Sequence, residues 1–438
     1  MIALLLALAC GGEAPEPSGE ATSSSSGEAT EAAVAPSEAP GEASASAAST
    51  PGSLSGPASP LPTPTLPQRV SGTAFPLQPT PEVSAAREVL LNVVRQEATD
   101  PNNPWAIAHG LLALGPEMEL REGGSAVDHI FREFADEVET NGHPLIAFPP
   151  SARAEDGSLI RIEPHTSLVM KALQESEVRL DRRVEVDGNP HQVGELWYHT
   201  VLSSYLDFAS GDSSWEGTDD MAWGLQAIGG FAEPGLAWRS GRVEVSLDKL
   251  TELAAHVLTT ESMHLIRAMQ AGEGYQRDGQ GILAYTCGGS HLLQGVAYLV
   301  GRDFGTSVER EKMALQARLL FYRFPRELMI YEQAIEANPN QELIVTVQQL
   351  KFVGHWLESA YKMSIMGLFE PTEQQQTAMM EAVGVLVSTV AKLKRLGALD
   401  NLEQIRASNE QLYLDIVGDS SHALRGLDLA LGVGKVRF

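Results

Sequence analysis

Residues 274–295 read GYQRDGQGILAYTCGGSHLLQG and form the most informative stretch of the chain. Glycines punctuate the segment, and the apolar residues that follow His291 recur with the three- and four-residue spacing of a helix. The stretch therefore predicts a loop that carries Cys287 and runs into a helix beginning at Gly289 or Ser290. We expect the candidate site of the protein at this junction.

Helical spacing extends over most of the chain from position 85 onward, with glycine and proline residues between the runs. No alternating run is long enough to predict a sheet, although residues 141–163 leave room for a minor hairpin. The sequence thus predicts an all-α domain over residues 85–438. The expected helices cover residues 85–94, 105–115, 126–138, 165–173, 191–208, 218–228, 247–269, 309–337, 341–368, 373–396, 402–417 and 422–431.

Histidines stand at or near the start of several apolar runs, at positions 109, 165, 199, 264, 291 and 355. The intervals between them vary, but a domain of this length divides into six units of roughly 60 residues, enough for a helical hairpin with its loops. We therefore expect a ring or solenoid of helical hairpins whose inner helices begin around one mouth.

This arrangement resembles the α/α-toroid superfamily, which includes terpene cyclases, protein prenyltransferase β subunits and lanthionine synthetase-like enzymes. The segment Gly229-Gly230-Phe231 is similar to the glycine-rich turns of prenyltransferase repeats. Asp219 and Asp220 match part of the cyclase aspartate motif, but glycine occupies position 217, where the proton-donating aspartate would stand. The resemblance implies a toroid shape and no particular reaction.

Prenyltransferases and lanthionine synthetases hold zinc partly through cysteine and histidine, and Cys287 with His291 is the counterpart in this chain. The pair is four positions apart, so both side chains reach one side of a helical segment. A helix N-terminus favours a thiolate and a neutral imidazole, which suits a zinc ligand or a nucleophilic Cys287. Burial of Cys287 as a structural residue is the third interpretation.

The remaining candidates lie on other predicted helices. His264 shares a face with His256 on the expected helix 247–269, where it is either a third metal ligand or a hydrogen-bonded core residue. His109, His165 and Trp223 are candidates for lining the cavity, and packing in the core is the alternative for each.

Asp219 and Asp220 open a predicted helix. They are candidates for proton transfer or metal binding in catalysis. The alternative is that Thr218 or Asp219 caps the helix and the second acid favours its dipole.

Residues 1–10 form a short apolar run that ends in Ala7-Leu8-Ala9-Cys10 and resembles a bacterial lipoprotein signal. The resemblance implies that Cys10 is acylated and anchors the protein to a membrane of the cell envelope. Cleavage as an ordinary secretory signal is the alternative. Residues 11–84 are rich in Ser, Ala, Pro and Glu and are expected to form a disordered tether.

The formal net charge of −26 argues against binding to nucleic acid or to an anionic lipid surface through a broad patch. The common nucleotide-binding, serine-hydrolase, zincin and calcium motifs are absent from the sequence. Two functions remain open: a zinc-assisted hydrolase or transferase centred on Cys287 and His291, or a non-catalytic envelope scaffold that binds a small molecule or polymer, with Cys287 buried.

Overall fold

The computed structural model describes residues 60–65, 75–154 and 157–433. The predicted lipoprotein signal with Cys10 and most of the predicted tether lie outside these residues and stay predictions. The described part of the tether lies against the domain, because the Thr65 amide donates to the carbonyl of Phe231 at 2.9 Å and the Leu77 amide to that of Ala430 at 2.7 Å. None of the described helices combines the length and apolar character needed to span a membrane.

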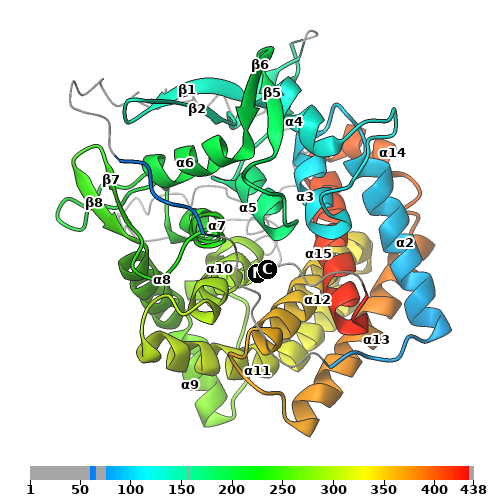
Figure 1. The fold of residues 1–438 in the computed structure, drawn as a ribbon. Coiled ribbons are helices and arrows are strands. Elements are labelled where there is room, and N and C mark those ends of the chain that lie inside the picture. Colours follow the sequence, from blue (N-terminus) through cyan, green and yellow to red (C-terminus); the bar gives the residue numbers. More distant parts are fainter. Residues whose placement is uncertain (1–59, 66–74, 155–156, 434–438) are drawn as a thin grey trace, which may run out of the picture.

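Six helices of the described chain form a closed inner ring (Figure 1). Each packs against the next, and the last returns to the first. The all-α prediction is confirmed, since helices dominate the described residues. The ring consists of α3 (Pro104–Leu114), α5 (Leu168–Glu175), α7 (Thr218–Gly229), α10 (Ser290–Gly301), α12 (Glu342–Ile365) and α15 (Glu410–Leu431).

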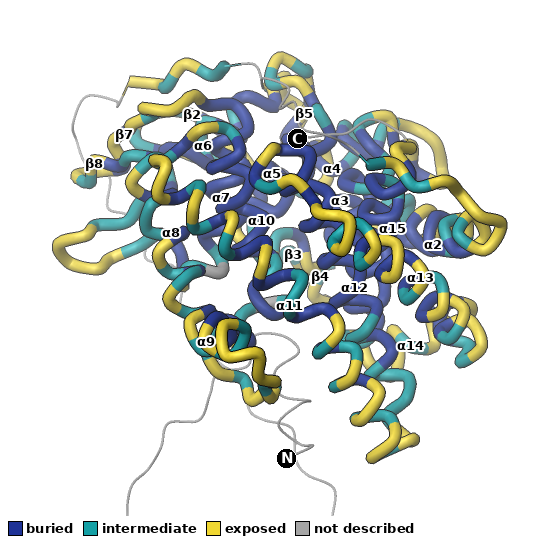
Figure 2. Tube along the Cα trace, turned by 90° about the horizontal axis from the view of Figure 1, so that it is seen from below, coloured by how far each residue is buried: buried dark blue, intermediate teal, exposed yellow. Residues whose placement is uncertain are grey.

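Outer helices surround this ring and explain why the inner helices are apolar on nearly every side. In Figure 2 the inner α10 is buried, whereas the outer α9 carries mostly exposed or half-exposed residues. The outer elements are α2 (Pro81–Ala98), α4 (Ala126–Phe134), α6 (Val193–Ser203), α8 (Leu247–Glu261), α9 (Met263–Ala271), α11 (Ser307–Ala337), α13 (Glu373–Arg395) and α14 (Leu402–Ser408), and short 3₁₀ turns form η1 (Gly281–Ala284), η2 (Thr286–Gly289) and η3 (Pro339–Gln341).

Four antiparallel β-hairpins, against an expectation of at most one minor hairpin, are present in the described residues. Two of them turn through Asn141-Gly142 and Asp187-Gly188, whose positive φ angles suit the tight two-residue turn of a hairpin. The strands were missed because each has only three to five residues. They pair as β1 (Asp136–Thr140) with β2 (His143–Ala147), β3 (Ser151–Arg153) with β4 (Leu159–Arg161), β5 (Arg183–Val186) with β6 (Asn189–Gln192), and β7 (Ala237–Ser240) with β8 (Val243–Ser246).

Two of the helix boundaries that differ from expectation bear on the site. The helix predicted over 247–269 breaks at Ser262 into α8 and α9, so that His256 and His264 do not share one helix. The break predicted at 418–421 does not occur, and α15 continues through it. This second difference matters for the site, because the continuous helix brings polar residues of α15 into the centre of the ring.

A candidate metal site in the central cavity

The ring encloses a cavity of about 670 Å³ on the side where the inner helices begin. Its walls come from the first half or the middle of these helices and from the segments that precede them. The helix dipoles therefore direct their positive ends toward the cavity. The lining residues are Trp105, His109, Arg161, Pro164, His165, Glu216, Gly217, Asp220, Trp223, Cys287, His291, Lys351, His355, Gln411, Leu414, Asp415, Gly418, Asp419 and His422.

An unusual backbone conformation brings Cys287 to the cavity. Cys287, Gly288 and Gly289 have φ angles of 52°, 61° and 78°, all in the left-handed region. For a cysteine this conformation costs about 1–3 kcal/mol, so the surrounding structure must hold it. A Cβ atom at Gly289 would lie 2.3 Å from Cγ1 of Ile282, which requires glycine there. Helix α10 begins at Ser290, at the junction that the sequence predicts.

Beside Cys287, three buried imidazoles come together from three inner helices. The ring centres of His291 and His355 are 5.0 Å apart, those of His355 and His422 are 4.0 Å apart, and those of His291 and His422 are 5.9 Å apart. Each of the three has an Nε2 atom with no hydrogen-bond partner in the described chain. One ligand atom each from Cys287, His291 and His355 lies within 4.8 Å of the other two. This cluster could hold a metal ion.

Hydrogen bonds fix the tautomer of two histidines that line the cavity. Nδ1 of His109 lies 2.9 Å from the carbonyl oxygen of Trp105, which can only accept, so Nδ1 carries the proton. Nδ1 of His422 lies 2.8 Å from Oε2 of Glu358 and donates to that carboxylate. In both residues Nε2 therefore keeps its lone pair. Such carboxylate or carbonyl partners on the opposite nitrogen are typical of metal-ligating histidines.

Burial keeps these imidazoles neutral, as metal binding requires. It lowers the pKa of His109 to about 3, and it lowers the pKa values of His291, His355 and His422 as well. Neighbouring histidines add to the effect for His109, His291 and His355.

Glu358 also lies within reach of His355 and His422, but its charge is already compensated. Its Oε1 lies 2.7 Å from Nζ of Lys362 and 3.1 Å from Nε of Arg425. Burial alone would raise the pKa of Glu358, but Lys362 and His422 outweigh this effect and hold the pKa well below its usual value. With two cations already bound, Glu358 is suited to orient His422 rather than to bind a metal.

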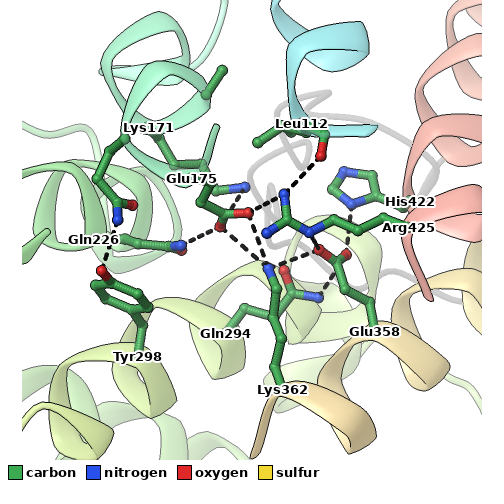
Figure 3. A network of polar contacts seen from close by, with 12 residues as sticks. Leu112, Lys171, Glu175, Gln226, Gln294, Tyr298, Glu358, Lys362, His422 and Arg425 are labelled. Atoms are coloured by element: carbon green, nitrogen blue, oxygen red, sulfur yellow. Dashed lines mark hydrogen bonds and ion pairs between the residues drawn. The ribbon is translucent and has the colours of Figure 1, made fainter. Parts of the chain in front are cut away.

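A second buried carboxylate completes this ionic network beneath the cavity (Figure 3). Glu175 pairs with Arg425 at 2.6 Å and with Lys362 at 3.1 Å, and Gln226 donates to the same carboxylate. Burial opposes ionisation of Glu175, but Arg425 and its neighbouring lysines lower its pKa to about 2. The side chains of Arg425 and Lys362 lie between the two carboxylates in Figure 3 and tie α5, α12 and α15 together.

Acidic residues of α15 lie beside the histidine cluster, where Oδ1 of Asp419 is 3.8 Å from Nε2 of His355. Nζ of Lys351 lies 3.1 Å from Asp415 and 3.9 Å from Asp419, and Oδ2 of Asp419 is buried without a hydrogen-bond partner in the described residues. Burial raises the pKa of Asp419 well above its usual value. The carboxylates of Asp415 and Asp419 can accept hydrogen bonds from a polar ligand in the cavity.

The structure places the predicted site residues unevenly. His109, His165, Trp223, Asp220, Cys287 and His291 all line the cavity. His264 does not: its ring packs against Gly281, where an added Cβ would lie 2.9 Å from Nδ1.

Of the predicted pair of aspartates, Asp220 accepts hydrogen bonds from the amide and hydroxyl of Thr166, at 3.0 and 2.8 Å. It thus fixes the segment before α5 while lining the cavity. The side chain of Asp219 is not among the described parts of the structure. Gly217 occupies the N-cap position of α7, so the predicted cap at Thr218 or Asp219 is wrong.

The prediction missed the site residues on α12 and α15, although a pattern of polar residues in the sequence indicates them. Both helices are apolar, and polar residues recur along each of them at intervals of three or four, which places them on one face. Because outer helices cover the other faces, such a stripe must point into the ring. The two stripes are Lys351, His355, Glu358 and Lys362 on α12, and Asp415, Asp419, His422 and Arg425 on α15.

Comparison of the chain with protein-family models, with curated proteins and with solved structures gives no match. The chemistry of the cavity therefore follows from its own geometry.

Proposed function

We propose that the central cavity binds one zinc ion through Cys287, His291 and His355, with His422 as the fourth ligand or as a neighbour of an open position. The supporting observation is that ligand atoms of two buried histidines and one cysteine lie within 4.8 Å of one another, and that Nε2 of each of these histidines has no hydrogen-bond partner in the described residues. An imidazole ring centre lies about 3.2 Å from a zinc ion bound at Nε2, so two histidines of a tetrahedral site have ring centres about 5 Å apart. The observed separations of 4.0–5.9 Å lie around this value.

Zinc is favoured over other common ions by the type of ligand. A thiolate together with imidazoles suits zinc, whereas magnesium and calcium prefer oxygen ligands. Burial holds the histidines in the neutral form that coordinates metal.

We further propose that the protein is a zinc-assisted hydrolase or transferase. Zinc with an open position polarises a carbonyl or phosphoryl oxygen and activates a bound water or thiolate. The cavity volume is large enough for a small molecule or the end of a polymer. Asp220 lines the same space and is our candidate for proton transfer; Asp219 stays a prediction.

The N-terminal sequence supports the place of action. The apolar run ending at Cys10 suggests an exported protein held to the cell envelope by a lipid, with the helical domain on a tether. Radiolabelled palmitate should be incorporated into the full-length protein in a bacterial host, and the Cys10→Ala variant should lose the label.

Metal analysis of the purified full chain tests the proposed site. We expect about one zinc per chain. Cys287→Ser and His355→Ala should lower this content, while His264→Ala, at a half-buried histidine outside the cavity, should leave it unchanged. Absence of zinc in a correctly folded protein would favour the non-catalytic binding module.

A further inference from the structure

The loop that carries Cys287, residues 275–289, packs against a second buried ionic cluster. This cluster is separate from the network of Figure 3 and is centred on Glu327 of α11. The Glu327 side chain is completely buried and accepts from the hydroxyl of Tyr275 at 2.9 Å. Arg323 and Arg277 donate to the same carboxylate at 3.2 and 3.4 Å. Arg277 also donates to the hydroxyl of Tyr331 at 2.7 Å. The cluster therefore joins the start of the loop, at Tyr275 and Arg277, to α11.

The same cluster reaches the end of the loop. Nη1 of Arg323 donates to the carbonyl oxygen of Gly288 at 3.0 Å. A Cβ atom on Gly288 would lie 3.0 Å from Nη2 of Arg323 and 3.8 Å from Nη2 of Arg277, so both guanidinium groups lie against this backbone. Gly288 directly follows Cys287, and a shift of its peptide would move the cysteine out of the cavity.

Stability alone is a weak explanation for such a cluster, because apolar residues of similar size often stabilise a core as well as buried ion pairs do. The carboxylate is ionised, since Arg277 and Arg323 outweigh the effect of burial and lower the pKa of Glu327. It thus fixes two long arginine side chains in one arrangement, and the loop they hold contains the strained left-handed Cys287.

We propose that Glu327, with Arg323 and Arg277, is a positioning device that holds Cys287 in its left-handed conformation so that its sulfur points at the metal ligands His291 and His355. The role in metal binding depends on the proposed function, whereas the role in loop conformation does not. Glu327 and its arginines act through the loop and do not touch the metal.

Two measurements on the full chain test this role in Glu327→Gln. The first is zinc affinity by competition with a chromophoric chelator, which should weaken about 10–100-fold, as for other residues that orient metal ligands. The second is hydrogen exchange of the peptide around residues 283–290 in metal-free protein, which should become about tenfold faster once the loop is released.

Glu309→Gln is the matched control. Glu309 lies on the same helix, has a side chain that is 4% exposed, and pairs with Lys312 at 3.0 Å far along the helix from the loop. This variant should lower thermal stability without changing zinc affinity or loop exchange. Arg323→Lys keeps the charge but loses the planar group that reaches both Gly288 and Glu327, and it replaces Glu327→Gln if that variant does not fold.

The outcomes separate the two proposals. If Glu327→Gln and Arg323→Lys lose stability like the control and keep wild-type loop exchange, the positioning role is overturned. If the wild-type chain binds no zinc, the proposed function fails, and the exchange of the metal-free loop still decides whether the cluster holds Cys287.

Discussion

Replacing Glu358 by glutamine should destabilise the ring more than most single substitutions. Oε1 of Glu358 contacts Lys362 and Arg425 at 2.7 and 3.1 Å. Oε2 accepts from His422 at 2.8 Å and from Gln294 at 3.2 Å. Glutamine has the same size, but its amide group would direct N–H donors either at a cation or at the N–H of His422.

The magnitude follows from the buried charges. Glu175 would be the one carboxylate of this network left for Lys362 and Arg425, and removing one partner of a buried ion pair costs about 3–5 kcal/mol. His422 would also lose the acceptor that fixes its tautomer, so zinc affinity should fall about 10–100-fold.

Urea denaturation followed by circular dichroism at pH 7 measures the first effect, and chelator competition measures the second. Asp181→Asn, in an exposed ion pair with Arg179, should leave both values unchanged. A loss of less than about 1 kcal/mol in Glu358→Gln, a value typical of surface pairs, together with wild-type zinc affinity, would refute the assigned role of the network.

Two further predictions concern the loop and the pH dependence. Gly289→Ala forces a Cβ atom to within 2.3 Å of Ile282 at a φ of +78°, so it should lower the melting temperature and reduce zinc content, whereas Gly384→Ala, with open space around the added methyl, should do neither. The pKa of folded His109 is about 3, whereas unfolded histidine titrates near 6.5, so the unfolded state takes up this proton first. The contribution of His109 to the unfolding free energy of metal-free protein should therefore decrease as the pH falls from about 6.5 toward 3. His109→Gln should lower the slope measured by urea titration between about pH 6.5 and 5, because it removes one group that takes up a proton only on unfolding; an unchanged slope would contradict a neutral buried His109.

The sequence predicted the helical class well because apolar residues recur at helical spacing along the chain, and that pattern is visible residue by residue. It predicted the junction at Ser290 for a related reason: the glycines before it cannot continue a helix, and the apolar run after it does. The short hairpins were not predicted because a strand of three to five residues shows too little alternation of apolar and polar residues. Their turns, Asn141-Gly142 and Asp187-Gly188, are nevertheless typical of hairpins.

For the site, local patterns indicated histidines at or near the start of apolar runs, such as His109 and His291, but gave no information on which helices meet. His264 and His355 both stand before apolar residues, and only the path of the chain puts His355 in the cavity and His264 outside. His422 was missed because the prediction placed it at the start of a separate helix over 422–431. In the structure, burial within the ring keeps this part of α15 helical.

X-ray absorption at the zinc edge of the full-length protein tests the central claim most directly. The proposed site predicts one sulfur at about 2.3 Å and two or three nitrogens at about 2.0–2.1 Å from the zinc. The sulfur should disappear in Cys287→Ser, and one nitrogen should disappear in His355→Ala. A wild-type spectrum without sulfur, or a folded protein that takes up no zinc, would contradict a metal site formed by Cys287 and the histidines of the inner ring.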